Sequence, residues 1–526
     1  MANKLELTWY GKENQVNVEP RILIEDKSLS NVVNGDTENM LIHGDNLLAL
    51  KALEKDYAGK IKCIYIDPPY NTGNAFSSYE DGLEHSIWLS LMRERLILLR
   101  KMLSPEGLIC IQIDNSPNSR TQQTPESPYL NVLCDEIFGR QNYMGLLVWK
   151  KKGNASNTAS GFGIITESIL VYAFDKSKCI VYKEEFDKHY KYKDSNGEYN
   201  LELFTKTDSG EYKRDTMKFD IIDPSTGIVY KPPIGKRWTF GLQTVETYLK
   251  NGLIIFQKGM PYFKHYRDGV NTKLYNNLLL EHGSLKSAKE ELVKLGFDRE
   301  EFETPKPEIL IKTILDMFSR EGDYVLDSFL GSGTTAAVAH KMRRRYIGVE
   351  MGQQAYTFCK PRIDKVIACE QGGISKAVNW QGGGGYRFYE LAPTLINEDA
   401  FGQKVISTDY NSDMLAAAIA LHEGYKYEPD NTCYWKQSYS ENNSYLFVTT
   451  NHISREIIDS IKTELKDDEF LLISCKSFDS NALEGVKNIS IKKIPQSLLS
   501  NCEFGVDNYS LNIVNPPTYE EESDDE

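Results

Sequence analysis

An acid, two prolines and an aromatic residue follow one another in the segment 61-IKCIYIDPPYNTGN-74. Residues 61–66 are mostly apolar and predict a buried strand, which Pro68 and Pro69 must end because proline cannot donate a ladder hydrogen bond. Asp67 and Tyr70 are therefore presented at the carboxyl end of a strand, on a backbone that the pyrrolidine rings stiffen. The motif predicts a site that needs a carboxylate held beside a flat aromatic ring.

A glycine-rich turn forms a second motif, in 324-YVLDSFLGSGTTAAVAH-340. A predicted strand ends at Asp327, and a turn with Gly331 and Gly333 then opens a helix, whose N-terminus offers free N–H groups to a ligand. The next predicted strand, 345–350, ends in Glu350, the position from which an acid binds ribose hydroxyls in nucleoside-binding α/β folds. The turn lacks the lysine of a phosphate-binding P-loop. These features favour a ribose-containing ligand.

Alternating strand and helix patterns surround both motifs and predict a mostly parallel sheet covered by helices. The pattern runs through residues 37–148, is interrupted by 149–300, and resumes over 301–394. The interrupting segment is rich in Lys, Tyr, Gly and short irregular strands. Residues 395–515 predict a further α/β unit, residues 1–36 an N-terminal arm, and residues 516–526 an acidic tail.

Composition and charge limit the class of protein. The chain has 526 residues and a formal net charge of -14, which alone argues weakly against nucleic-acid binding. Basic residues nevertheless exceed acidic ones over residues 150–280, so local DNA binding is compatible with the sequence. The cysteines show no CxxC spacing, which favours a reducing cytoplasm and argues against a structural zinc. No apolar run is long enough to span a bilayer, and the N-terminus has no signal pattern.

Together, the two motifs resemble those of the S-adenosylmethionine-dependent amino-methyltransferases of DNA. The DPPY motif (67–70) precedes the FLGSG motif (329–333) with a long insert between them, the order of the beta class. LIHGDNLLALKAL, YIDPPYNTG, GLICIQID, ETPKPE, LDSFLGSGTT and GGGGYRFYEL resemble the modification subunits of type III restriction systems, over residues 37–395. The resemblance implies an α/β fold: a Rossmann-like methyltransferase sheet, circularly permuted, with an inserted target-recognition domain and an extra C-terminal α/β domain.

The resemblance also assigns roles to residues. Asp67 and the carbonyl of Pro68 would accept hydrogen bonds from the amino group of a flipped adenine, and Tyr70 would stack on the base. No metal is expected. Asp45 equally fits the N-cap of the following helix, and Lys306 equally fits a surface lysine. The residues expected to bind S-adenosylmethionine are Asp45, Asp67, Lys306, Asp327, Phe329, Gly331, Gly333, Thr334 and Glu350.

Basic residues of the middle segment are expected to contact DNA phosphates. They are Lys150, Lys151, Lys152, Lys236 and Arg237. The aromatic residues Trp238, Tyr262 and Phe263 fit base contacts and the core of a small domain equally well.

The resemblance thus implies a site-specific adenine N6-methyltransferase of double-stranded DNA in a bacterial or archaeal cytoplasm. A homodimer and a nuclease–helicase restriction subunit as partner are expected from the same resemblance. Two alternatives stay open: a cytosine-N4 methyltransferase, and a recognition subunit that acts mainly with a nuclease–helicase partner. The target sequence cannot be predicted, because base contacts depend on how the loops of the insert fold.

Overall fold

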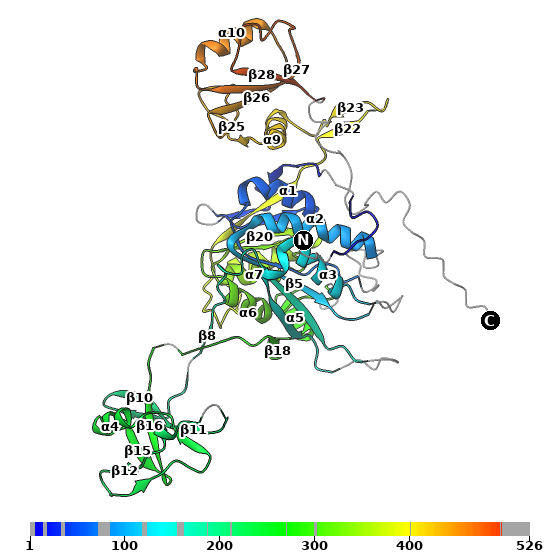
Figure 1. The fold of residues 1–526 in the computed structure, drawn as a ribbon. Coiled ribbons are helices and arrows are strands. Elements are labelled where there is room, and N and C mark those ends of the chain that lie inside the picture. Colours follow the sequence, from blue (N-terminus) through cyan, green and yellow to red (C-terminus); the bar gives the residue numbers. More distant parts are fainter. Residues whose placement is uncertain are drawn as a thin grey trace, which may run out of the picture. The chain divides into compact units, whose positions relative to one another are not determined.

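The chain forms two compact units in a computed structural model, Met1–Tyr182 with Asn276–Glu526, and Lys183–Tyr275 (Figure 1). The structure describes residues 6–13, 18–32, 37–71, 85–117, 124–154, 162–186, 188–210, 213–269, 271–298, 302–399, 401–494 and 496. The acidic tail predicted at 516–526 lies outside these residues. Within the described part, no helix is long and apolar enough to cross a membrane.

One large sheet organises the first unit, in the strand order β1-β21-β3-β20-β19-β4-β5-β7-β6-β18, with β2 paired to β21. Strands β3, β20, β19, β4 and β5 run parallel, and β7 is antiparallel to both β5 and β6. The strands are β1 (Leu23–Glu25), β2 (Asn31–Val32), β3 (Met40–His43), β4 (Ile61–Ile66), β5 (Leu103–Asp114), β6 (Tyr143–Lys150), β7 (Thr166–Ala173), β18 (Leu278–Leu279), β19 (Tyr324–Asp327), β20 (Arg345–Glu350) and β21 (Gly385–Leu391).

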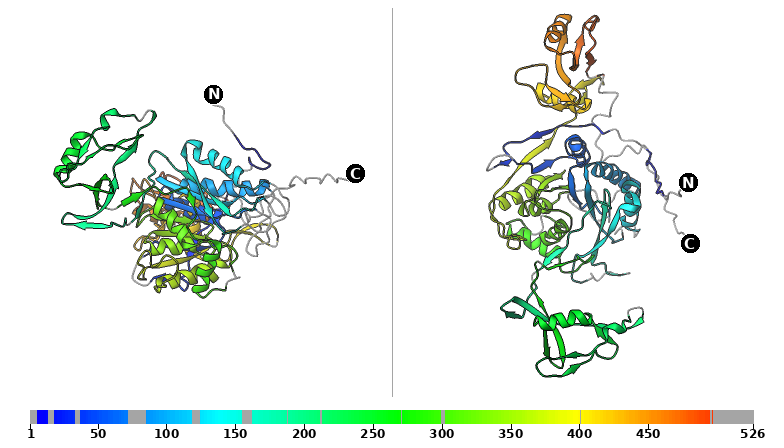
Figure 2. Two further views of the ribbon diagram at one scale, coloured as in Figure 1. Left: turned by 90° about the horizontal axis from the view of Figure 1, so that it is seen from below. Right: turned by 60° about the vertical axis from the view of Figure 1, so that its left-hand side comes forward.

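Helices cover both faces of this sheet, as its central strands require, because a parallel strand must be buried on both sides. Ile64 and Ile66 of β4 share a core cluster with helices α1 and α2, while the alternating Cys63 and Tyr65 are also buried. In the right-hand view of Figure 2, α1 and α2 (blue) and the green helices lie on opposite sides. The helices are α1 (Asn46–Tyr57), α2 (His85–Met102), α3 (Ser127–Cys134), α5 (Leu285–Lys294), α6 (Glu308–Phe318), α7 (Thr334–Lys341) and α8 (Lys360–Ile367).

The strand order reverses between β19 and β4. From β19 the chain continues to β20 on one side, and from β4 it continues to β5 on the other. Ligands of open α/β sheets bind at such a switch point, outside the carboxyl ends of the strands. The half that carries β4 precedes the half that carries β19 in the chain. This confirms the predicted Rossmann-like sheet in its permuted order.

The second unit is narrower than the insert expected at 149–300. β6, β7 and β18 complete the large sheet, so only Lys183–Tyr275 separates from it. A four-stranded sheet, β15-β16-β10-β9, and Trp238 at 0% exposure form its centre. Its elements are β8 (Glu184–Phe186), β9 (Tyr192–Asp194), β10 (Gly197–Leu203), β11 (Thr205–Thr207), β12 (Ile221–Ile222), β13 (Val229–Tyr230), β14 (Lys236–Trp238), α4 (Leu242–Lys250), β15 (Ile254–Gln257), β16 (Met260–Tyr266) and β17 (Asn271–Lys273).

The N-terminal and C-terminal regions of the chain belong to different sheets. β1 and β2 pair with β21, so this part of the expected N-terminal arm belongs to the large sheet. The C-terminal α/β region has a sheet of its own, in the order β24-β25-β26-β27-β28. Its elements are β22 (Ile396–Glu398), β23 (Lys404–Ile406), α9 (Ser412–Glu423), β24 (Lys426–Tyr427), β25 (Ser438–Ser440), β26 (Ser444–Ile453), α10 (Arg455–Glu464), β27 (Phe470–Phe478) and β28 (Ile489–Lys493).

Candidate active site

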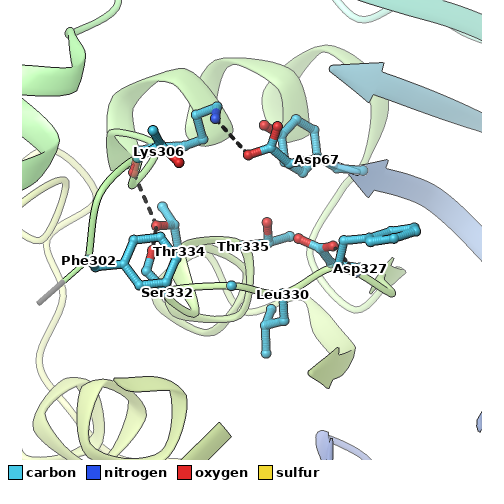
Figure 3. A pocket seen from close by; sticks show the side chains of 12 residues that line it. Asp67, Phe302, Lys306, Asp327, Leu330, Ser332, Thr334 and Thr335 are labelled. Atoms are coloured by element: carbon cyan, nitrogen blue, oxygen red, sulfur yellow. Dashed lines mark hydrogen bonds and ion pairs between the residues drawn. The ribbon is translucent and has the colours of Figure 1, made fainter. Parts of the chain in front are cut away.

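A pocket lies at the strand ends where the sheet order reverses (Figure 3). β4 runs into Asp67 and β19 ends at Asp327. Because both strands are parallel, their carboxyl ends meet at one edge. The pocket therefore brings together residues of both sequence motifs. The predicted site residues that line it are Asp67, Lys306, Asp327, Phe329, Gly331 and Thr334.

The DPPY turn is braced on several sides. The hydroxyl of Tyr70 donates a hydrogen bond to Oδ1 of Asp67 at 2.5 Å. The indole N–H of Trp88, which is fully buried on α2, donates to the carbonyl of Pro69 at 2.8 Å. Pro68 is buried, and Asn71 has a positive φ of 56° that turns the chain after the motif. The carboxylate and the ring are thus held side by side, as the sequence predicts.

Lys306 is a buried member of the site and not a surface lysine. Its side chain is 5% exposed, and its Nζ lies 2.6 Å from Oδ2 of Asp67 and 3.8 Å from Oε2 of Glu167. Burial raises the pKa of Asp67, and the Lys306 ammonium opposes that rise. The segment before α6 therefore supplies the positive charge of the pocket, from a part of the chain far from β4 in sequence.

The glycine turn has the backbone geometry that its composition predicts. Gly331 and Gly333 have φ values of 55° and 76°, in the left-handed region. A Cβ on Gly333 would lie 3.1 Å from the Cα of Cys359, so a larger residue would be strained in conformation and tightly packed. Glu350, 7% exposed, accepts hydrogen bonds from the N–H groups of Gly331 at 2.7 Å and Gly352 at 3.0 Å.

The acids at the ends of β19 and β20, Asp327 and Glu350, are both buried. Asp327 is 2% exposed and accepts a hydrogen bond from the N–H of Phe329 at 2.9 Å. Burial raises its pKa from 3.8 to about 7. Burial also raises the pKa of Glu350 above its ordinary value. Thr334, at the start of α7, donates to the carbonyl of Lys306 at 3.1 Å and so ties the helix to the lysine segment.

Asp45 has the alternative role that the sequence left open. It is the N-cap of α1, where its Oδ1 accepts a hydrogen bond from the N–H of Leu48 at 3.0 Å. Its Oδ2 pairs with the buried Arg95 at 3.2 Å. The pocket is not lined by Asp45. A contact of this residue with the cofactor stays a prediction.

Two of the five basic residues predicted to contact phosphate are buried. Lys151 is 6% exposed, because it pairs with Asp114 and, at 3.5 Å, with Glu167. Arg237 is 8% exposed, and its guanidinium donates to the carbonyl of Trp238 at 3.3 Å. Lys236 is exposed, and Lys150 and Lys152 are half-buried. Charge alone could not predict this difference, because acids that are distant in sequence decide which lysines are buried.

Glu167 contacts residues of the site, although it does not line the pocket, and the sequence did not predict it. It lies in β7, is 2% exposed, and accepts hydrogen bonds from Tyr70 at 3.1 Å and from Gln112 at 2.5 Å. An acid near the start of the otherwise apolar strand 166-TESILVYA-173 was the available indication. A buried acid in a central strand seldom persists without a partner.

The sequence model of the DNA methylase family matches residues 61–360. The chain is 33% identical over 463 residues to the probable type III restriction-modification enzyme HindVI Mod subunit of Haemophilus influenzae, covering 74% of this chain and 58% of that protein. It is 29% identical over 380 residues to the type III restriction-modification enzyme StyLTI Mod subunit of Salmonella typhimurium, covering 64% of this chain and 54% of that protein. It is 23% identical over 375 residues to the DNA adenine methyltransferase YhdJ of Escherichia coli, covering 69% of this chain and 97% of that protein.

The chain spans somewhat more than half the length of these two Mod subunits. The family match covers more than half of the chain and includes both the DPPY turn and the glycine turn. These two turns line the same pocket in the structure. The chain therefore belongs to the DNA methylase family.

Proposed function

We propose that this chain transfers a methyl group from S-adenosylmethionine to the N6 amine of a flipped adenine at a specific site in double-stranded DNA. One observation carries the proposal: Asp67 of the DPPY turn lines the same pocket as the glycine turn, at the switch point of the sheet. The carboxylate that would bind the amine thereby lies next to the turn that would bind the cofactor. Relatives named as Mod subunits and as an adenine methyltransferase support the same reaction.

The residues of the pocket fit S-adenosylmethionine. Gly331 leaves room that a Cβ would take, 3.2 Å from the ring of Phe302, and α7 begins at Gly333 without a side-chain cap. Phe329, Gly331 and Gly333 would pack against the methionine part, and Glu350 would accept hydrogen bonds from the ribose hydroxyls. Lys306 would lie at the methionine end. When bound, the cofactor supplies a methyl group activated by a sulfonium.

The residues of the DPPY turn would prepare the amine. The lone pair of the adenine amine is delocalised into the ring, so the amine is a poor nucleophile. Asp67 and the carbonyl of Pro68 would accept its two N–H hydrogen bonds and draw the nitrogen towards a tetrahedral geometry. The ring of Tyr70 would stack on the flipped base, a contact worth about 1–3 kcal/mol. The rigid turn then aligns the nitrogen with the methyl group, and alignment supplies much of the rate.

The wider assignment is that of a modification subunit of a type III restriction system. The Lys183–Tyr275 unit would read the target site, and a nuclease–helicase subunit would be the partner. A homodimer in the cytoplasm would allow one copy to recognise DNA while the other modifies it. The relatives named as Mod subunits support this assignment over the matched part of the chain.

The decisive experiment expresses this chain alone in a host that lacks DNA methylation and sequences the DNA by a single-molecule method. We expect N6-methyladenine in one defined sequence motif. N4-methylcytosine in a defined motif would move the assignment to the cytosine-N4 reaction, which uses the same exocyclic-amine chemistry. Unmodified DNA from cells that contain the folded, cofactor-binding protein would contradict an activity independent of a partner.

A further inference from the structure

A second buried carboxylate lies beside Asp67, on the antiparallel side of the sheet. Glu167 of β7 is paired in register with Asp114 of β5 and with Trp149 of β6. Lys151 follows β6 directly, so the ends of these strands bring Asp114, Glu167 and Lys151 to the edge where Asp67 follows β4. The neighbourhood of Asp67 therefore includes residues from strands that neither sequence motif contains.

Glu167 contacts the same two groups that hold Asp67. The hydroxyl of Tyr70 lies 2.5 Å from Asp67 Oδ1 and 3.1 Å from Glu167 Oε2. The ammonium of Lys306 lies 2.6 Å from Asp67 Oδ2 and 3.8 Å from Glu167 Oε2. Gln112 donates to Glu167 Oε2 at 2.5 Å, and Lys151 lies 3.5 Å from its Oε1. Glu167 is thus fixed from one side and touches Tyr70 and Lys306 on the other.

A buried carboxylate is a costly way to fill space. Removing an ion from water has a large free-energy cost, and well-packed apolar residues of similar volume are often as stable as a buried ion pair. Gln112, Tyr70 and Lys151 offset this cost at Glu167 with hydrogen bonds and opposite charge. Glu167 lies next to the pocket, because its carboxylate is 3.8 Å from the ammonium of the pocket residue Lys306.

We propose that Glu167 is a positioning residue for methyl transfer, which holds the Tyr70 hydroxyl and the Lys306 ammonium so that the Asp67 carboxylate keeps one orientation towards the target amine. The inference rests on the proposed function and adds to it a residue outside the DPPY and glycine turns. Glu167 touches neither the base nor the methyl group in this role. It acts through the groups that contact Asp67.

The charge of Glu167 also acts on Asp67. Burial raises the pKa of Asp67, Lys306 opposes the rise, and the negative charge of Glu167 adds to it. Removing that charge should therefore lower the pKa of Asp67 and leave it ionised at lower pH. The charged and titratable groups that act on Asp67 are Tyr65 and Tyr70 near β4, Glu167 from β7, Lys306 before α6, and Asp327 from β19.

The test compares Glu167→Gln with the wild-type chain in a methyl-transfer assay over a range of pH. Gln keeps the size and an acceptor for Tyr70 but removes the charge. We expect kcat to fall about 10-fold to 100-fold, the range for weakening a hydrogen bond to a charged group, with KM for DNA unchanged. The acidic limb of the kcat profile should move to lower pH. Asp175→Asn, beyond the other end of β7, removes the same charge and should change neither quantity.

Folding and catalysis are separated by further measurements. Thermal unfolding of each variant reports its folded fraction, and Glu167→Asp keeps the charge but shortens the reach to Tyr70. We expect Glu167→Asp to lower kcat without moving the acidic limb. If an active wild-type chain and Glu167→Gln share the same kcat and acidic limb, the inference is overturned and the proposed function stands. If the folded wild-type chain methylates no DNA, the proposed function fails and the inference fails with it.

Discussion

Both carboxylate oxygens of Asp67 have partners within the chain. Oδ1 accepts the hydrogen bond of Tyr70, and Oδ2 pairs with Lys306. A carboxylate oxygen can accept more than one hydrogen bond, so a target amine can bind beside these contacts. At the scale of the residue, protein groups therefore orient the Asp67 carboxylate at both of its oxygens.

Asp67→Ala tests the division of labour within the pocket. We expect kcat for methyl transfer to fall by about 10²–10³-fold, the range for removing one preorganised hydrogen-bonding group. Binding of S-adenosylmethionine should persist, because Phe329, Gly331 and Glu350 are untouched. A radiolabelled methyl-transfer assay and calorimetric binding measure the two effects. Asp56→Ala, an exposed acid on α1, is the control. Loss of cofactor binding with little effect on transfer would contradict the assigned roles.

Asp327→Asn tests the titration of a buried acid. The folded-state pKa of Asp327 is raised from 3.8 to about 7, so the stability associated with its protonated form is present below pH 3.8 and is lost as pH rises through 7. Asn mimics the protonated acid. The free energy of unfolding of the variant should therefore exceed that of the wild type above pH 7, by at most about 4 kcal/mol. Its unfolding temperature should be higher there and unchanged at pH 4.

The control for this pH dependence has the opposite sign. The hydroxyl of Ser177 lowers the pKa of the half-buried Asp175. Asp175→Asn should therefore lose stability at neutral pH and not at low pH. Thermal unfolding curves over the pH range measure both variants. A difference between Asp327→Asn and the wild type that does not change with pH would refute a titrating Asp327.

At the scale of the element, the turn between β19 and α7 depends on a backbone conformation that only glycine adopts readily. Gly333 is the N-cap of α7 at a φ of 76° and packs against Cys359. The pocket lies at the carboxyl ends of β19 and β4, and residues of this turn line it. The element therefore combines a local conformational requirement with close packing against Cys359, the residue that precedes α8.

Gly333→Ala should destabilise the chain and weaken cofactor binding. A left-handed conformation costs an L-residue about 1–2 kcal/mol, and the Cβ contact with Cys359 adds to it. Gly485→Ala is the matched control, because Gly485 has a φ of 72° with no atom within 4 Å of the added Cβ. Thermal unfolding and calorimetric titration of S-adenosylmethionine measure the effects. Equal loss of stability in both variants, without loss of affinity, would show that packing at Gly333 is unimportant.

At the scale of the whole molecule, the residues predicted to contact DNA are distributed over both compact units. Lys151 belongs to the buried charge network of the first unit, and Arg237 to the centre of the second. Lys236 remains exposed on β14. Of the residues predicted to contact phosphate in the Lys183–Tyr275 unit, Lys236 is the one whose ammonium is accessible.

Lys236→Gln should reduce the salt dependence of DNA binding. Each lost phosphate contact lowers the slope of log K against log salt by about 0.9, and this effect should be independent of the DNA sequence. Titrations of fluorescent DNA at several salt concentrations measure the slope. Lys462→Gln, an exposed lysine of α10, should leave it unchanged. An unaltered slope for Lys236→Gln would remove this residue from the proposed interface.

The sequence by itself determined the fold class, the strands that lead into the two motifs, and the turns that follow them. Local conformational preferences explain the apolar run 61–66, the two prolines and the glycines at 331 and 333. Such preferences depend on neighbours in the sequence and not on the tertiary structure. Asp67, Tyr70 and the glycine turn were therefore placed correctly at strand ends. The resemblance implied that both motifs serve one methyl-transfer reaction, and Asp67 and the glycine turn line one pocket in the structure.

Only the tertiary structure decided which charged residues are buried together. Lys306 pairs with Asp67, Lys151 with Asp114, and Glu167 lies between them. No periodicity predicts such pairs, because their members come from different strands and meet only when the sheet assembles. The sequence of a basic segment does not show which of its lysines are buried. The residues that surround each lysine in the folded chain determine whether it contacts solvent or an acid.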